Sequence, residues 1–188
     1  MLKNAVTNPT PILVILGGIG PAAGCILHNM IIQNTIVKTT RDHLTVLHIS
    51  DGPHIYDGSQ YLNALRNNEE WQDENPGKLM GIVARNAALT CKLFGRTCIM
   101  TSPCNTWHSP QIHESFTSYF KDWNKENFKE GEPGHTKYLH MPNICAEYAS
   151  NQGYKTVGVM STNGTSKQKL YRNPMEAAGT KVVEVDDV

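Results

Sequence analysis

The chain has 188 residues, 39 % of them hydrophobic, which is enough for one substantial core or two small lobes. Lysine plus arginine number 17, as do aspartate plus glutamate. The chain therefore has no excess of positive charge with which to bind nucleic acid, and no acidic tail. No apolar segment approaches the ~20 residues that cross a membrane, and the N-terminus lacks a signal-peptide pattern. The five cysteines show no zinc spacing. We expect a reduced, soluble, cytoplasmic protein with a small-molecule partner, and no nucleic acid or membrane partner.

The first half of the chain alternates between strand and helix patterns. Residues 11–18 (PILVILGG) form an apolar run that ends in glycines, typical of a buried strand, and residues 21–37 follow with helical spacing behind Pro21. Residues 43–50 predict a second strand, which a polar loop follows. Residues 76–95 have a proline start, a helical stripe and a glycine stop, and residues 97–102 predict a third strand. This order predicts a parallel sheet covered by helices.

The second half of the chain is more polar at first and then resumes the alternation of strand and helix patterns. Residues 107–137 have no clean period, so we expect one or two short helices and a loop between lobes. The further expected elements are a strand at 137–141, a helix at 142–153, a strand at 154–160, a helix at 165–179 interrupted near Pro174, and a strand at 180–185. The predicted fold class is α/β, with two Rossmann-like lobes, residues 1–107 and 108–188, of which the second is incomplete.

Ligands of parallel α/β sheets bind beyond the carboxyl ends of the strands. The segments there are GGIGP, SDGPHIYDGS, TSPCNT and STNGT, rich in hydroxyls, amides and bare backbone N–H groups that suit an anion. The first also contains a formal G-x-G-x-x-A pattern (Gly18, Gly20 and Ala23), which raises dinucleotide binding. Pro21 removes an N–H donor and no acidic residue follows at the expected spacing, so backbone approach to a small ligand is favoured over NAD or FAD, with a packing turn as the alternative.

Cys104 differs from the other cysteines by its place in the chain. It follows a predicted strand and Pro103, precedes a predicted helix, and has Asn105 and Thr106 as neighbours. Such a position lowers the pKa of a thiol, which favours a working cysteine over an inert one. The other cysteines lie within predicted helices or strands, where free cysteine is usually a small buried hydrophobe: Cys25, Cys91, Cys98 and Cys145.

Two further side-chain groups have a chemical and a structural interpretation. His108, four residues after Cys104, would be the base of a Cys/His acyl-transfer site, although no third, orienting group is evident. The remaining histidines show no metal-ligand pattern, so no metal site is expected.

Thr162 or Thr165 is expected to cap a helix, or to hold a carboxylate together with Gly164, and the two roles are compatible.

Taken in order, GGIGPAAG, PCNTWH and VGVMSTNGTSKQKLY…EAAGTKVVEVDD resemble the aspartate/glutamate (and hydantoin) racemase family over nearly the whole chain. The resemblance implies two α/β lobes with the substrate between them and no cofactor. One cysteine from each lobe faces the α-carbon, so that a thiolate removes the α-proton and a thiol returns one on the far face. It implies that Cys104 is one acid/base, that Asn105, Thr106, Thr162, Gly164 and Thr165 hold the α-carboxylate, and that Gly18 and Gly20 give backbone access.

The sequence departs from the family pattern in places that affect function. The second cysteine belongs to a late G-C-T-E-like motif, and the chain ends before one, so we expect a truncated or degenerate member. Gly58 stands where the members of the family that act on aspartate have an arginine. The large Trp107 follows CNT, where the family usually has a small residue. We expect a racemase-like protein for a small α-amino acid, impaired by the missing second cysteine. We also expect a homodimer, because the incomplete second lobe leaves an apolar sheet face open. The alternatives are a non-catalytic binding or assembly relative, and a one-cysteine carboxylate lyase or isomerase.

Overall fold

The computed structural model describes residues 10–17 and 21–184. Its main sheet has four parallel strands in the order β2-β1-β3-β4. These strands are β1 (Ile12–Gly17), β2 (Val46–Ser50), β3 (Cys98–Thr101) and β4 (Thr136–Leu139). Ile15 pairs with His48 on one side and Thr101 on the other. The carboxyl ends of all four strands therefore lie along one edge of the sheet.

A second parallel sheet consists of β5 (Thr156–Val159) and β6 (Lys181–Glu184). Val157 of β5 pairs with Val182 of β6. The predicted α/β class with parallel sheets is confirmed. The predicted division between residues 107 and 108 stays a prediction; by hydrogen bonding, β4 belongs with β3 and not with β5.

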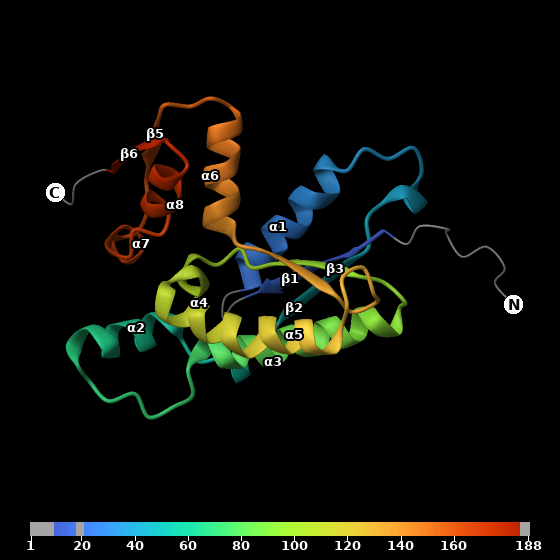
Figure 1. Ribbon diagram of the computed structural model, residues 1–188, viewed down its shortest axis with the longest axis horizontal. Helices are drawn as coiled ribbons and strands as arrows, with labels where there is room; N and C mark the ends of the chain where they lie inside the picture. Colours follow the sequence, from blue (N-terminus) through green and yellow to red (C-terminus); the bar gives the residue numbers. More distant parts are fainter. Residues whose placement is uncertain (1–9, 18–20, 185–188) are drawn as a thin grey trace, which may run out of the picture.

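Helices lie on both sides of the main sheet, with α1 on one side and α3, α4 and α5 on the other (Figure 1). Their bounds are α1 Pro21–Asn34, α2 Gly58–Asn67, α3 Pro76–Leu93, α4 Pro110–Phe116, the π-helical η4 Thr117–Lys121, α5 Asp122–Asn127, α6 Met141–Asn151, α7 Asn163–Lys167 and α8 Arg172–Ala177. Short 3₁₀ turns are η1 Thr40–Asp42, η2 Gly52–His54 and η3 Asn105–His108. No helix among the described residues is both long and apolar enough to span a membrane.

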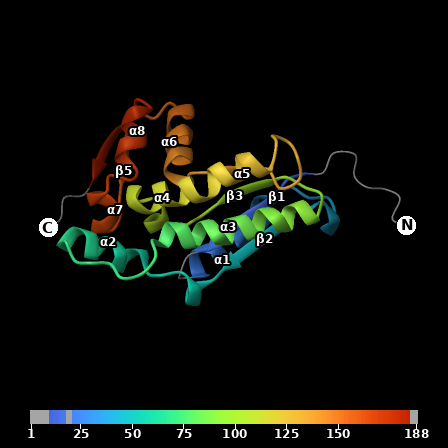
Figure 2. The same cartoon turned by 60° about the horizontal axis from the view of Figure 1, so that its bottom comes forward.

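The main core lies between the sheet and α3, where small side chains allow a close approach. Ala84, Ala87, Ala88 and Cys91 of α3 are fully buried, and Val14 and Met100 of the strands belong to the same cluster. A smaller cluster of Ala146, Met175 and Val182 joins α6 and α8 to the second sheet. The molecule thus has a large core and a separate small one. Figures 1 and 2 place α6, α8, β5 and β6 together at one end.

Several elements differ from the sequence prediction. Residues 58–67, of which the first three were expected in a loop, form α2, because the Asp57 carboxylate accepts hydrogen bonds from the backbone N–H groups of Ser59 and Gln60. The segment 110–127 is one continuous helical stretch with a π-helical turn inside it. The predicted helix at 165–179 is interrupted before Pro174, where Lys169 adopts a φ of 52° between α7 and α8. Pro174 itself lies in the first turn of α8, where proline is tolerated.

Candidate active site

Cys104 lies beyond the carboxyl end of β3, at the residue before the 3₁₀ turn η3. Its side chain is half-buried and packs against the main core. Trp107, the large residue that departs from the family pattern, is directed into that core and is 2 % exposed. The Cys104 loop is thus anchored by a buried aromatic side chain and leaves its thiol partly accessible. Gly18 and Gly20, expected at the end of β1, lie outside the described residues.

A hydrogen bond connects the Cys104 loop with the segment between α7 and α8. The hydroxyl of Tyr171 donates to Asn105 Oδ1 at 2.7 Å, across 66 positions of sequence. Burial raises the pKa of Tyr171 to about 12, so the hydroxyl keeps its proton at neutral pH and remains a donor. This bond occupies the acceptor of the Asn105 amide and leaves its NH₂ group to donate elsewhere.

The predicted substrate loops meet at a cavity of about 260 Å³. Thr106, Thr162, Gly164 and Thr165 all line it, although the sequence separates Thr106 from the others by more than one complete βα unit. Cys104 and Asn105 do not line the cavity themselves; they precede Thr106 directly in the chain. The other wall is formed by α2, and α2 and α7 lie at the same end of the molecule in both views (Figures 1 and 2). The site is therefore assembled from three distant segments.

Thr162 and Thr165 present hydroxyl groups at this cavity. Thr162 occupies the N-cap position of α7, but its side chain accepts no capping hydrogen bond, so the expected side-chain cap by Thr162 is wrong. Its Oγ1 atom lies 3.3 Å from Thr165 Oγ1 instead. Because one hydroxyl donates to the other in this pair, the accepting hydroxyl keeps a proton that it can turn toward a bound anion.

Arg66 is a charged residue of the cavity that the sequence patterns did not indicate. It lines the cavity from α2 together with Ser59 and Asn63, and its Nη1 atom donates to Asn63 Oδ1 at 3.1 Å. The spacing i, i+4 and i+7 of these residues would have placed them on one helix face, had a helix been predicted there. A guanidinium beside two threonine hydroxyls makes the cavity suited to a carboxylate.

His108 is not available as a base for Cys104. It is 3 % exposed, its Nε2 atom lies 2.9 Å from the carbonyl oxygen of Ser102, and burial lowers its pKa to about 3. These features argue against the Cys/His acyl-transfer alternative. The structure does, however, bring His108, His113 and His140 together, with one ring nitrogen of each within 4.8 Å of the others, which the sequence spacing had not indicated.

The other cysteines lie within regular elements, as expected, but are not all buried. Cys91 and Cys98 are buried, Cys145 is half-buried, and Cys25 on α1 is exposed, so the core assignment of Cys25 is wrong. None of these cysteines belongs to a loop at the carboxyl end of a strand.

The fold is shared with structures of aspartate racemases. The chain superimposes on Picrophilus torridus aspartate racemase with a TM-score of 0.63 and 22 % identity, covering 94 % of this chain and 63 % of that one. An aspartate racemase homologue from Pyrococcus horikoshii OT3 gives a TM-score of 0.60 at 16 % identity, covering 95 % of this chain and 66 % of that one. No protein-family model matches the sequence, and no curated protein is significantly similar to it. The chain thus has the α/β fold that the resemblance implied, over a little less than two thirds of the length of these structures.

Proposed function

We propose that the chain is a member of the aspartate/glutamate racemase family and a cofactor-independent amino-acid isomerase, with Cys104 as a proton-transfer thiol. The observation that carries the proposal is the shared cavity: Thr106, two residues after Cys104, lines it together with Thr162, Gly164 and Thr165. These are substrate-carboxylate residues that the sequence resemblance implies. The fold shared with aspartate racemase structures supports the same interpretation.

The chemistry assigned to these residues is proton transfer at an α-carbon. The thiolate of Cys104 forms an S–H bond with the α-proton, and the electron pair of the broken C–H bond delocalises into the adjacent carboxylate. The hydroxyls of Thr106 and Thr165 and the NH₂ group of Asn105 stabilise the added charge on those oxygens. The Tyr171 hydroxyl holds Asn105 Oδ1 and so orients the amide. Cys104 alone can return a proton only to the face from which it came, so inversion of the centre needs a second acid on the opposite face, the role that the family resemblance gives to a second cysteine.

The proposal is tested by hydrogen exchange at the α-carbon. The protein is incubated in D₂O with each enantiomer of aspartate, glutamate and several neutral amino acids, and loss of the α-proton signal is followed by NMR. We expect exchange on at least one of them, and a loss of 10²-fold or more in Cys104→Ser, because general acid–base groups contribute about 10²–10⁴-fold. Cys25→Ser, which removes an exposed thiol on α1, is the matched control and should exchange normally.

Each alternative has its own signature in this experiment. Exchange that is unchanged in Cys104→Ser would contradict the assignment of that thiol. Binding of an amino acid without exchange in the wild type would favour the non-catalytic relative. A new product in place of the enantiomer would favour the one-cysteine lyase or isomerase. The homodimer stays a prediction, which light scattering tests directly.

A further inference from the structure

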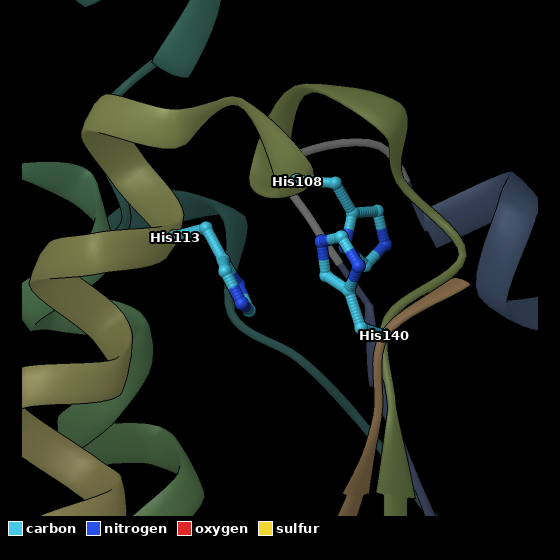
Figure 3. A group of neighbouring side chains, drawn as sticks. All are labelled: His108, His113 and His140. Carbon is cyan, nitrogen blue, oxygen red and sulfur yellow. The ribbon is translucent and has the colours of Figure 1, made fainter. Parts of the chain in front are cut away.

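Three histidines from three separate segments converge beside the Cys104 loop. His108 ends η3, His113 lies in α4, and His140 follows β4 at the N-cap of α6. Figure 3 shows the ring of His113, which projects from α4, beside the rings of His108 and His140. The His108 and His140 ring centroids are 4.7 Å apart, those of His113 and His140 are 4.3 Å apart, and one nitrogen of each ring lies within 4.8 Å of the others.

The hydrogen bond of His108 determines which of its nitrogens is free. Nε2 lies 2.9 Å from the Ser102 carbonyl oxygen, which can only accept, so Nε2 carries the proton and Nδ1 keeps its lone pair. A histidine whose outer N–H is held by a carbonyl is the usual arrangement of a metal ligand. The cluster therefore contains one imidazole that is already in the tautomer and orientation of a ligand.

Buried ring nitrogens of the cluster lack partners. Within residues 10–17 and 21–184, no hydrogen bond is made to His108 Nδ1 or to His113 Nδ1, and both atoms are buried. A side-chain hydrogen bond with Asn143 takes up at most one nitrogen of the His140 ring, which leaves the other for a ligand role. A buried polar atom without a partner costs about 1–3 kcal/mol, so two of them side by side are unusual in a folded protein. A single ion that accepts all three lone pairs would remove this cost at once.

The histidines have the protonation state that a metal requires. Burial lowers the pKa of His108 to about 3 and that of His113 to about 4. Burial also lowers the pKa of His140, an effect that a side-chain hydrogen bond with Asn143 partly opposes. The imidazoles are neutral at pH 7, so an ion would not have to displace protons from them.

The spacing fits a transition metal with a modest inward shift. For nitrogens at most 4.8 Å apart, a central point lies within about 2.8 Å of each, since 4.8/√3 is about 2.8. Zinc–imidazole bonds are about 2.0–2.1 Å long, so each ring needs to move inward by roughly 0.7 Å. Three imidazoles without a carboxylate favour Zn²⁺ or a related ion over Mg²⁺ and Ca²⁺, which prefer oxygen ligands.

One side of the cluster faces a cavity. His113 and His140 line a space of about 440 Å³ together with Lys121, Lys125 and Lys137. This space gives an ion a route to the rings and leaves room for a water molecule or an anion as a further ligand, and the lysines favour an anion. A three-histidine site with an open position is the arrangement of reactive rather than purely structural zinc.

We propose that His108, His113 and His140 bind one divalent transition-metal ion, with Zn²⁺ as the best fit, and that a coordination position of the ion opens into the cavity lined by Lys121 and Lys125. The site is separate from the proton transfer assigned to Cys104, and nothing in that chemistry requires it. Its three ligands and its cavity belong to a different group of residues from the cavity of Thr106 and Thr165.

The test is metal titration of protein that carries no polyhistidine tag and has been dialysed against chelator. Zn²⁺ is added in competition with a chromophoric chelator, and Co²⁺ binding is followed by its visible absorption spectrum. We expect one ion per chain, bound with a Kd below about 10 µM, a Co²⁺ spectrum typical of four coordination, and no binding of Mg²⁺ or Ca²⁺ in the same range.

Variants locate the ion within the cluster. His113→Phe, which keeps a ring beside Phe116 and Tyr138, and His140→Gln should each weaken Zn²⁺ binding by 100-fold or more. His135→Ala is the matched control, because His135 lines the same cavity but is not in the cluster, and should bind Zn²⁺ as the wild type does. Thermal melts of the metal-free variants establish that they are folded. Absence of stoichiometric binding, or unchanged binding in both folded variants, would overturn the proposal.

Discussion

Arg66 gives the cavity between α2 and α7 a positive charge that the motifs alone had not indicated. Gly58 stands where the family resemblance implies an arginine, but Arg66, two turns further along α2, directs its guanidinium toward Gly164 of α7. A cation that pairs with a substrate carboxylate can thus come from the helix instead of the preceding loop. This places recognition of an acidic side chain within reach of the proposed site.

We predict that Arg66→Met raises the KM for an acidic amino acid by 10-fold or more and changes the KM for a neutral one little, because a charge-assisted pair contributes about 1.5–3 kcal/mol. Steady-state kinetics or ligand titration measures the effect. Lys167→Met on α7 removes the same charge from an exposed side chain that does not line the cavity, and should leave both values unchanged. Equal effects of the two variants would show that Arg66 acts only through net charge.

The contact between α3 and α4 depends on the absence of a side chain at Gly77. Asn75 caps α3, its Oδ1 accepting from the Gly77 N–H at 2.8 Å, and its amide donates to Tyr61 and to the Gln111 carbonyl. A Cβ atom at Gly77 would overlap the carbonyl oxygen of Ile112, which is backbone and cannot rotate away. The two helices can approach each other this closely only through glycine.

Gly77→Ala is accordingly expected to lower the free energy of unfolding by about 1–3 kcal/mol, the usual cost of overpacking. Urea denaturation followed by far-UV circular dichroism measures it. Gly158→Ala in β5 is the control, because an added Cβ there meets no atom within 4 Å. A Gly77 variant as stable as this control would mean that α3 and α4 separate without cost.

The sequence was sufficient for the elements with strong hydrophobic periodicity and insufficient for the contacts between them. Strand β1, which ends in glycine, and helix α3, which begins at Pro76, agree with prediction to within a few residues. Helix α2 was missed because its start, with Gly58 and Ser59, has turn composition, and its signal is the Asp57 cap. Hydrophobic periodicity does not reveal such a cap, because the hydrogen bonds of the Asp57 side chain exist only once the backbone has formed the first helical turn.

The candidate site was predictable in part for a similar reason. Thr106 and Thr165 were predicted because each lies in a segment that follows a strand and is rich in hydroxyl and amide groups suited to an anion. The histidine cluster was not, because its members are separated by 5 and 27 positions in the chain. They meet because β3 and β4 are parallel neighbours, so that the residues after both strands share one edge. Strand order, which local patterns do not determine, creates the cluster.

The buried histidines also connect the stability of the whole molecule to pH. Their folded-state pKa values lie below the ordinary 6.5, so below that pH the unfolded chain binds protons that the folded chain does not. Stability contributed by the neutral rings is fully present above about pH 6.5 and is lost as the pH falls toward 4, by up to about 1.4 kcal/mol per pH unit for each histidine.

We therefore predict that chelator-treated protein loses stability between pH 6.5 and 4.5 and that His113→Phe, which removes one of these groups, has a shallower slope. Urea melts of both proteins at several pH values give the comparison, in which the carboxylates common to both cancel. Parallel slopes would indicate that His113 takes up a proton in the folded state as readily as in the unfolded one.

The two parallel sheets have separate cores. The cavity of Thr106 and Thr165 lies where the segment after β3 meets the segment after β5. A molecule bound there would touch residues of both parts and would tie their unfolding together. Its binding free energy would then add to thermal stability, by about 2.7 kcal/mol at a concentration of 100 Kd. A panel of amino acids and dicarboxylates screened by melting temperature would thus identify the preferred ligand class. Because this screen measures binding and not turnover, it can also be carried out with Cys104→Ser.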